Sequence, residues 1–361
     1  MDSIYLSLLE NQSNILHPVL ATVVRTRGSA PQVPGSSALF DDKGLVAGTI
    51  GGGAVEKKIQ EISADRFRSG HSGFFNFNLA NDISKKEDAI CGGQITILVD
   101  AEPLKHVSVF NQIRDSLSVK EPGILMTLIQ NAKEKDAIIE RFWATRAEAV
   151  KLPETIQQKG ELVVKEMLLM GDPAGYCELD ATQETGSPSY LFFESIYPPV
   201  RLVIAGAGHI GKALAHLGKL LGFEVIVVDD RNEYANPRNI PDASQIIADE
   251  VGLVLKGLQK NTNTFIVIVT RGHKDDAEAL KACIAGNAGY LGMIGSRKKI
   301  SAMREEFLKN GWATAEQWDA VHMPIGLGIN ARTVEEIAIS IAAQLIEVKN
   351  KTKDKLKGCP T

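Results

Sequence analysis

The sequence predicts an α/β protein with two domains, an α+β, β-rich N-terminal domain followed by a doubly wound parallel sheet. Its 361 residues, 44% of them hydrophobic, suffice for two cores of ordinary domain size. Before residue 198, short apolar runs alternate with Gly- and Pro-rich turns, whereas after residue 200 strand and helix patterns alternate. Because Pro198-Pro199 cannot continue a strand ladder, we expect domains at residues 1–197 and 200–348.

The first domain is expected to be mostly strands. A short amphipathic helix over residues 1–10 precedes them. Asp41-Asp42-Lys43-Gly44 predicts a hairpin turn, because glycine readily adopts the positive φ that such turns need. Gly51-Gly52-Gly53 leads into residues 54–68, where apolar residues recur at helical spacing. The predicted strands cover residues 19–24, 38–40, 45–50, 74–79, 94–99, 123–129, 137–144, 162–169 and 191–197.

The second domain is expected to alternate strands with helices, which is typical of a parallel sheet covered on both faces. The predicted strands cover residues 201–205, 224–229, 265–269 and 290–294. The predicted helices cover residues 210–221, 275–284 and 334–348. The Lys-rich residues 349–361 are expected to form a flexible tail.

A glycine motif stands at the first turn of the second domain. Gly206, Gly208 and Gly211 form a GxGxxG pattern between an apolar strand and a helix, which indicates a Rossmann-like, dinucleotide-binding fold. In this fold the glycines permit a tight turn, approach of the backbone to a pyrophosphate, and close packing of helix on strand. Asp229 ends the next strand, where a carboxylate can accept hydrogen bonds from ribose; this favours NAD over NADP, although Arg231 suits a 2′-phosphate. The alternative is a Rossmann pocket adapted to another ligand.

Four further residues are expected at the same edge, because turns after parallel strands lie at the carboxyl end of the sheet. They are His209, His273, Ser296 and Arg297. Arg297 lies at a helix start suited to phosphate or carboxylate, or on a solvated helix face. His209 and His273 are candidates for acid–base chemistry or metal binding, and alternatively are ordinary hydrogen-bonded loop residues.

Composition argues against several classes of protein. A formal charge of -4 gives no field that would draw the chain to nucleic acid or to anionic lipid. No apolar run approaches the roughly 20 residues needed to cross a bilayer, and the acidic N-terminus does not resemble a secretory signal. The four cysteines form no CxxC pair, which argues against disulfides and structural zinc. We therefore expect a cytoplasmic protein that does not bind nucleic acid or membranes.

Short motifs occur in one order along residues 20–345. They are GSAP (28–31), GTIGGGAVE (48–56), CGG (91–93), GAGHIG (206–211), GYLGMIGSR (289–297) and HMPIGL through ARTVEEIA (322–338). Together they resemble the XdhC/CoxI family of molybdenum-enzyme accessory proteins. Ala54 stands where many members carry Cys, and Arg271-Gly272 stands where others carry His-Asp, which suggests a separate branch of the family.

The resemblance implies an accessory protein that binds molybdenum cofactor and assists its sulfuration and its insertion into xanthine dehydrogenase or a related molybdenum hydroxylase. It also implies a homodimer, and a cysteine desulfurase is a further expected partner. The cofactor is an anionic pterin with a phosphate and a dithiolene, so bare backbone donors suit it. The expected cofactor loop consists of Ser29, Gly51, Gly52, Gly53, Glu56, Cys91, Gly92 and Gly93, with Cys91 as candidate molybdenum ligand or sulfur carrier. Alternatively, the glycines only make a tight turn and Cys91 is a small buried side chain.

Two other functions compete with the accessory role. The first is an NAD(P)-dependent oxidoreductase in which His209 or His273 assists hydride transfer. The chain offers no Tyr-x-x-x-Lys pair to support it. The second is a regulatory scaffold whose nucleotide pocket senses redox state without turnover. Turnover of a nicotinamide cofactor separates the oxidoreductase from both non-enzymatic roles.

Overall fold

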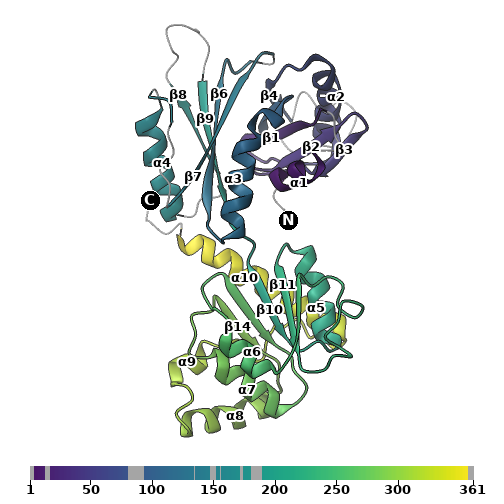
Figure 1. Ribbon diagram of the computed structural model, residues 1–361, viewed down its shortest axis with the longest axis vertical. Helices are drawn as coiled ribbons and strands as arrows, with labels where there is room; N and C mark the ends of the chain where they lie inside the picture. Colours follow the sequence, from purple (N-terminus) through teal and green to yellow (C-terminus); the bar gives the residue numbers. More distant parts are fainter. Residues whose placement is uncertain are drawn as a thin grey trace. The chain divides into compact units, whose positions relative to one another are not determined.

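The computed structural model divides the chain between Pro198 and Pro199 into an N-terminal and a C-terminal unit, each of which is described by itself (Figure 1). The described residues are 4–12, 17–79, 93–133, 135–146, 152–154, 156–170, 174–179 and 189–356.

The N-terminal unit begins with an antiparallel sheet of strand order β3-β2-β1-β5-β4. Its elements are α1 (Ile4–Asn11), β1 (Val19–Arg27), β2 (Ser37–Asp41), β3 (Gly44–Gly48), α2 (Gly53–Ser69), β4 (Gly73–Asn78) and β5 (Gln94–Asp100). The predicted hairpin is confirmed: Asp41 accepts hydrogen bonds from the N–H groups of Lys43 and Gly44, and Gly44 has a φ of 129°. Helix α2 buries Val55 and Ile59 against this sheet, which holds the start of α2 beside the glycine run.

A second antiparallel sheet, of order β7-β6-β9-β8, completes the N-terminal unit. Its elements are η1 (Pro103–His106), α3 (Val107–Ser118), β6 (Gly123–Gln130), β7 (Ile138–Thr145), α4 (Gln157–Met170), β8 (Ala174–Leu179) and β9 (Ser189–Ile196). The strand predicted at residues 162–169 is wrong, because this segment belongs to α4. Gly160, Val163, Val164 and Met167 follow helical spacing, and the last three pack in one core.

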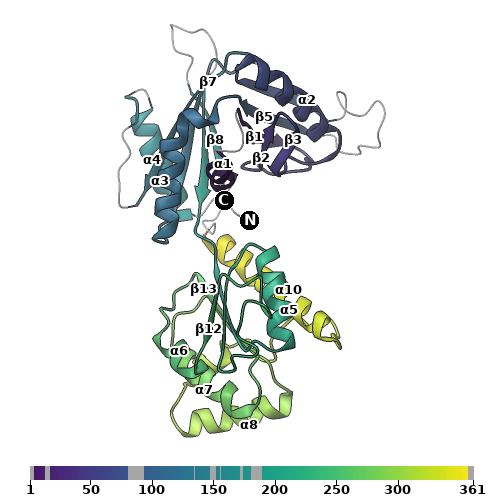
Figure 2. The ribbon, with the colours of Figure 1, turned by 45° about the vertical axis from the view of Figure 1, so that its right-hand side comes forward.

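The C-terminal unit is a parallel sheet of order β12-β11-β10-β13-β14, which confirms the predicted doubly wound fold. Its elements are β10 (Arg201–Ala205), α5 (His209–Leu220), β11 (Glu224–Asp229), β12 (Gln245–Ala248), α6 (Val251–Gly257), β13 (Thr264–Ile268), α7 (His273–Cys283), β14 (Tyr290–Met293), α8 (Arg297–Lys309), α9 (Ala315–Asp319) and α10 (Val334–Leu356). Leu202 and Ile204 pack with α5 and α10, whereas Val203 and Ala205 pack with α6, α7 and α8. Helices therefore cover both faces of the sheet (Figure 2).

Two element boundaries differ from expectation. Strand β1 continues through Arg27, because Arg25–Arg27 pair with Gln94–Thr96 of β5. Helix α10 continues to Leu356 instead of ending at Val348, so residues 349–356 are helical. Residues 357–361 lie outside the described part of the chain.

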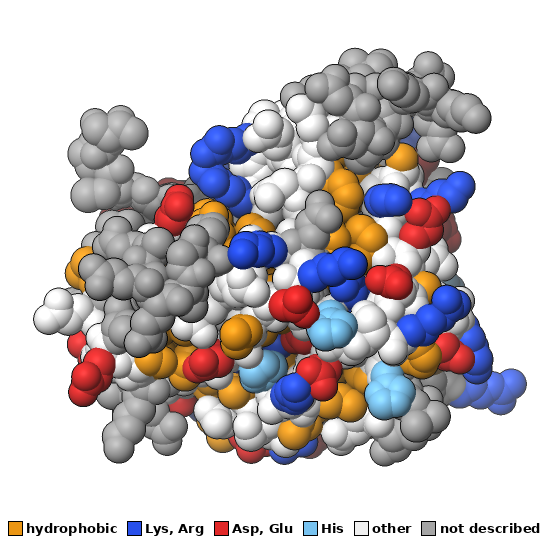
Figure 3. All heavy atoms as spheres, turned by 90° about the horizontal axis from the view of Figure 1, so that it is seen from above, with side chains coloured by type: hydrophobic (Ala, Val, Ile, Leu, Met, Phe, Trp, Pro, Cys, Tyr) orange, Lys and Arg blue, Asp and Glu red, His pale blue; other side chains and the backbone are white. Residues whose placement is uncertain are grey.

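The charge of the surface and the length of the helices indicate which partners the protein can have. On the face shown in Figure 3, basic and acidic side chains are interspersed among polar and apolar ones. Among the helices of the described residues, none is both long and apolar enough to pass through a bilayer.

Candidate functional site

The C-terminal glycine corner, residues 206–211, joins β10 to α5. Gly206 has a φ of 117°, and a Cβ there would overlap the carbonyl of Val269. A Cβ at Gly211 would overlap the carbonyl of Gly206, so this glycine lets α5 pack closely on the turn. Gly208 differs from both, because no atom in the described part of the chain lies within 4 Å of a Cβ placed there. Two glycines are therefore required by packing, and the third leaves open space at the helix start.

The first turn of α5 is open to an anion. Gly208 is its N-cap and provides no side-chain cap, so the first N–H groups of α5 are left for a ligand or solvent. By contrast, Ser296 caps α8 by accepting a hydrogen bond from the N–H of Lys299. The positive end of α5 with bare amides suits a phosphate.

Asp229 is occupied by protein donors. Its Oδ1 accepts hydrogen bonds from the N–H of Arg231 (3.0 Å) and Arg231 Nε (2.8 Å), and its Oδ2 accepts from Arg231 Nη2 (2.8 Å) and the N–H of Ala207 (2.7 Å). Burial alone would raise the pKa of Asp229, but these hydrogen bonds outweigh it and lower the pKa below its ordinary value. The carboxylate thus ties the loop after β11 to the glycine corner.

The other predicted edge residues lie at the turns that follow β10, β13 and β14. His209 and His273 are the first residues of α5 and α7, Ser296 is the N-cap of α8, and Arg297 begins α8. All four side chains are exposed. Because the three strands are parallel and in register, the structure brings these turns to one edge of the sheet.

Sequence reasoning missed a buried carboxylate at this edge. Asp276, in the first turn of α7, is fully buried. It accepts hydrogen bonds from Thr270 Oγ1 and from Lys299 Nζ. Burial is the main cause of its raised pKa, and the hydrogen bonds from Lys299 and Thr270 oppose that shift. The signal in the sequence was only an acidic first helical turn, which normally indicates a solvated residue.

The N-terminal glycine corner, residues 51–53, joins β3 to α2. Gly52 and Gly53 have φ values of 65° and 57°, and a Cβ at either would meet no atom of the described residues within 4 Å. Glu56 Oε2 accepts hydrogen bonds from Thr49 Oγ1 (2.9 Å) and the N–H of Gly52 (3.3 Å). The turn is therefore open at two glycines, and a carboxylate satisfies one of its amides.

Three segments predicted to form the cofactor loop converge at this corner. A Cβ at Gly51 would lie 2.8 Å from Pro31 Cγ, and a Cβ at Gly93 would overlap the carbonyl of Ser29. These close approaches bring residues 29–31, the N-terminal glycine corner and Gly93 together. Cys91 and Gly92 lie outside the described residues. The described residues contain no group of three or more His, Cys, Asp or Glu side chains placed to hold a metal ion.

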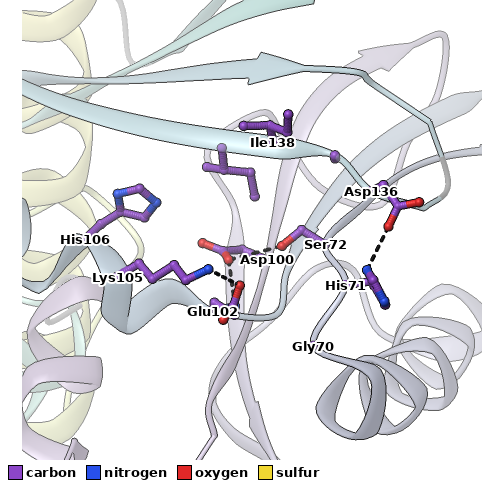
Figure 4. Close-up of a pocket in the computed structure, with 11 residues that line it drawn as sticks. Gly70, His71, Ser72, Asp100, Glu102, Lys105, His106, Asp136 and Ile138 are labelled. Atoms are coloured by element: carbon purple, nitrogen blue, oxygen red, sulfur yellow. Dashed lines mark hydrogen bonds and ion pairs between the residues drawn. The ribbon is translucent and has the colours of Figure 1, made fainter.

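A cavity of about 290 Å³ lies elsewhere in the N-terminal unit, between the end of α2, β5, η1 and β7 (Figure 4). Its charged wall residues are paired: His71 Nδ1 lies 2.7 Å from Asp136 Oδ1, and Lys105 contacts Glu102. Asp100 is bound by a buried arginine of β7. Because the wall groups satisfy one another and neither glycine corner lines the cavity, we do not assign a ligand to it.

Two family models and a related protein match this chain, and all three point to the same family. A model described as the XdhC Rossmann domain matches residues 202–345, and a model of the XdhC and CoxI family matches residues 17–78. A protein of Bacillus subtilis (strain 168) that is named as a probable xanthine dehydrogenase subunit is 28% identical over 348 residues, which cover 96% of each chain.

One further protein is similar to part of the chain, and one solved structure is similar in fold. Uncharacterized protein YqeB of Escherichia coli (strain K12) is 35% identical over 151 residues, which are 42% of this chain and only 27% of YqeB. A crystal structure of a xanthine dehydrogenase from Bacillus halodurans is 23% identical, with a TM-score of 0.77 over 96% of each chain. The latter has the same fold.

Proposed function

Because the chain belongs to the XdhC and CoxI family, we propose that it is an accessory protein of xanthine dehydrogenase or a related molybdenum hydroxylase. In this proposal it binds molybdenum cofactor, shields it during sulfuration and hands it to the hydroxylase. A cysteine desulfurase supplies the sulfur, and two copies of the chain form a homodimer in the cytoplasm. The observation that carries the proposal is the convergence of residues 29–31, the N-terminal glycine corner and Gly93.

The residues at the N-terminal glycine corner fit such a group. Among the described residues, none fills the space beside Gly52 and Gly53, and the N-cap Gly52 has no side chain to cap α2, so the first amides of the helix can face a phosphate. Glu56 Oε2 is engaged, but Glu56 Oε1 accepts from no described residue and can accept from the N–H groups of a pterin. A ligand with both donors and a phosphate therefore suits this corner better than a simple anion. When bound, the cofactor would bring the molybdenum that the hydroxylase needs.

The proposal is tested by transfer of the cofactor. The protein is incubated with extracted molybdenum cofactor, separated from free cofactor, and mixed with cofactor-free xanthine dehydrogenase, whose activity is then measured. We expect Gly53→Ala to reduce the activity that is gained, because a Cβ enters the open space beside the α2 amides. The control is Gly70→Ala, since Gly70 also has a positive φ (69°) and open space but lies at the other end of α2. Equal transfer by the two variants would remove the N-terminal glycine corner from the site.

The C-terminal glycine corner supports a second candidate, an NAD(P)-dependent oxidoreductase. The specific observation is a complete glycine turn with an uncapped α5, which can bind the pyrophosphate of NAD or NADP. In the accessory role the same corner binds a nucleotide without turnover. Steady oxidation of NADH or NADPH with a small substrate would favour the oxidoreductase.

A further inference from the structure

Arg231 lies on the loop after β11, beside the C-terminal glycine corner, and its guanidinium makes a two-point contact with Asp229. With its own N–H group, Arg231 supplies three of the four hydrogen bonds that Asp229 accepts. Asp229 is only 2% exposed. Both of its oxygens therefore already have two donors each.

A ribose diol could bind Asp229 only by displacing these donors. The bonds to the guanidinium are charge-assisted and about twice as strong as bonds between neutral groups. The bond to the N–H of Ala207 also holds the turn of the glycine corner. Displacing the guanidinium would replace an ion pair by hydrogen bonds from neutral hydroxyls, and displacing the N–H of Ala207 would release the turn, so Asp229 is poorly suited to the ribose role expected from the sequence.

One nitrogen of the Arg231 guanidinium, Nη1, is available to a ligand. Among the described residues, none accepts a hydrogen bond from Arg231 Nη1, and the side chain is 23% exposed. The guanidinium carbon lies 4.2 Å from the ring centre of Tyr234, which restricts the orientation of the guanidinium plane. The nearest other carboxylate, Asp230, lies 3.9 Å from Arg231 Nε and is 69% exposed, so its charge is largely screened by solvent.

We propose that Arg231 binds a phosphate on the adenosine ribose, so that the C-terminal glycine corner selects a 2′-phosphorylated nucleotide of the NADP class over its unphosphorylated counterpart. Asp229 is then a positioning residue that orients Arg231 and holds the turn at Ala207. An arginine at this place in a Rossmann-like fold is well placed for a 2′-phosphate, because the ribose lies at the end of the second strand. This proposal rests on nucleotide binding at the glycine corner and reverses the preference for NAD predicted from Asp229.

The decisive test uses the unmodified protein. Calorimetric titration compares 5′-AMP with 2′,5′-ADP, and NAD⁺ with NADP⁺, since each pair differs only in the 2′-phosphate. We expect the 2′-phosphate to tighten binding by about tenfold or more, as a charge-assisted hydrogen bond from Arg231 Nη1 would. Equal or weaker binding of the 2′-phosphorylated member of each pair would overturn the proposal while leaving nucleotide binding intact. Binding of none of the four would instead contradict nucleotide binding at the corner.

Two variants assign the effect to Arg231. Arg231→Leu is expected to abolish the preference for the 2′-phosphate, whereas Arg238→Leu is expected to keep it, because Arg238 is exposed on the same loop and does not contact Asp229. Arg231→Leu leaves a buried carboxylate without its cation, so the double variant D229N/R231L removes that charge and separates folding from binding. Retention of the preference in the double variant would overturn the assignment.

Discussion

Replacing Glu194 by glutamine perturbs a buried titrating group that joins distant parts of the N-terminal unit. Glu194 lies on β9 and is 7% exposed, and its Oε2 accepts a hydrogen bond of 2.6 Å from the hydroxyl of Tyr5 on α1. Burial raises the pKa of Glu194 to about 7, although the Tyr5 hydrogen bond and Arg141 act in the opposite direction. The folded protein therefore holds a proton that the unfolded chain releases near pH 4.5.

The sign and size of the effect follow from these two pKa values. Between pH 4.5 and 7 the folded state binds one more proton at Glu194 than the unfolded state, so the free energy of unfolding falls as pH rises. At about 1.4 kcal/mol per pH unit, the full window is worth about 3 kcal/mol. This contribution is fully present below pH 4.5 and is lost as pH rises through 7.

His106 acts in the opposite direction. Burial lowers its pKa from 6.5 to about 4, so stability is lost as pH falls from 6.5 towards 4. The two contributions partly cancel in the unmodified protein, whereas Glu194→Gln lacks the contribution of Glu194 and keeps that of His106. The difference in unfolding free energy between the two proteins isolates Glu194.

Guanidinium unfolding at a series of pH values measures this difference. Replacing Trp312 and Trp318 by phenylalanine in both proteins leaves Trp143 as the only tryptophan, and Trp143 lies in the same core as Tyr5. We expect the unfolding free energy of the Glu194 protein, relative to Glu194→Gln, to fall by about 3 kcal/mol from pH 4.5 to above pH 7. Parallel pH profiles of the two proteins would show that the pKa of Glu194 is not raised by burial.

Three further predictions concern the glycine corners and the sheet edge. Gly208→Ala is expected to keep the melting temperature of the protein but to lose nucleotide binding in titrations. Gly211→Ala is expected to lose about 1–3 kcal/mol of stability, because its Cβ overlaps the carbonyl of Gly206. A stability loss in Gly208→Ala and none in Gly211→Ala would contradict the roles given to the two glycines. Lys299→Met is expected to cost about 3–5 kcal/mol in denaturant unfolding, because it leaves Asp276 buried and without its cation. Cys91→Ala is expected to weaken cofactor retention or sulfuration with unchanged circular dichroism, and unchanged retention and sulfur transfer would exclude Cys91 from the site.

Much of the fold follows from local sequence patterns. The parallel sheet and the roles of Gly206 and Gly211 could be predicted, because strand period, helix period and turn chemistry are encoded within a few residues. The strand predicted at residues 162–169 is wrong because two short apolar runs, residues 162–164 and 167–169, are compatible with a strand and with a helix. Packing of this segment against the sheet that contains β6 and β9 favours the helix over the strand.

The chemistry of the sites depends on contacts between distant residues more than the fold does. Tyr5 and Glu194 are 189 positions apart, and Asp276 and Lys299 are 23 apart, so no local pattern reveals either pair. Asp229 is recognisable at the end of its strand, but three of its four donors depend on how Arg231 folds back, and the fourth is the N–H of Ala207, 22 positions earlier. The hydrogen-bond partners set by the fold, rather than residue type alone, therefore determine what these carboxylates can bind.

The most direct test of the accessory role is the molybdenum content of the protein. The purified chain is incubated with extracted molybdenum cofactor, passed through gel filtration, and assayed for molybdenum and pterin per chain. We expect nearly one of each per chain. Molybdenum and pterin no higher than those of an unrelated protein treated in the same way would contradict the accessory role.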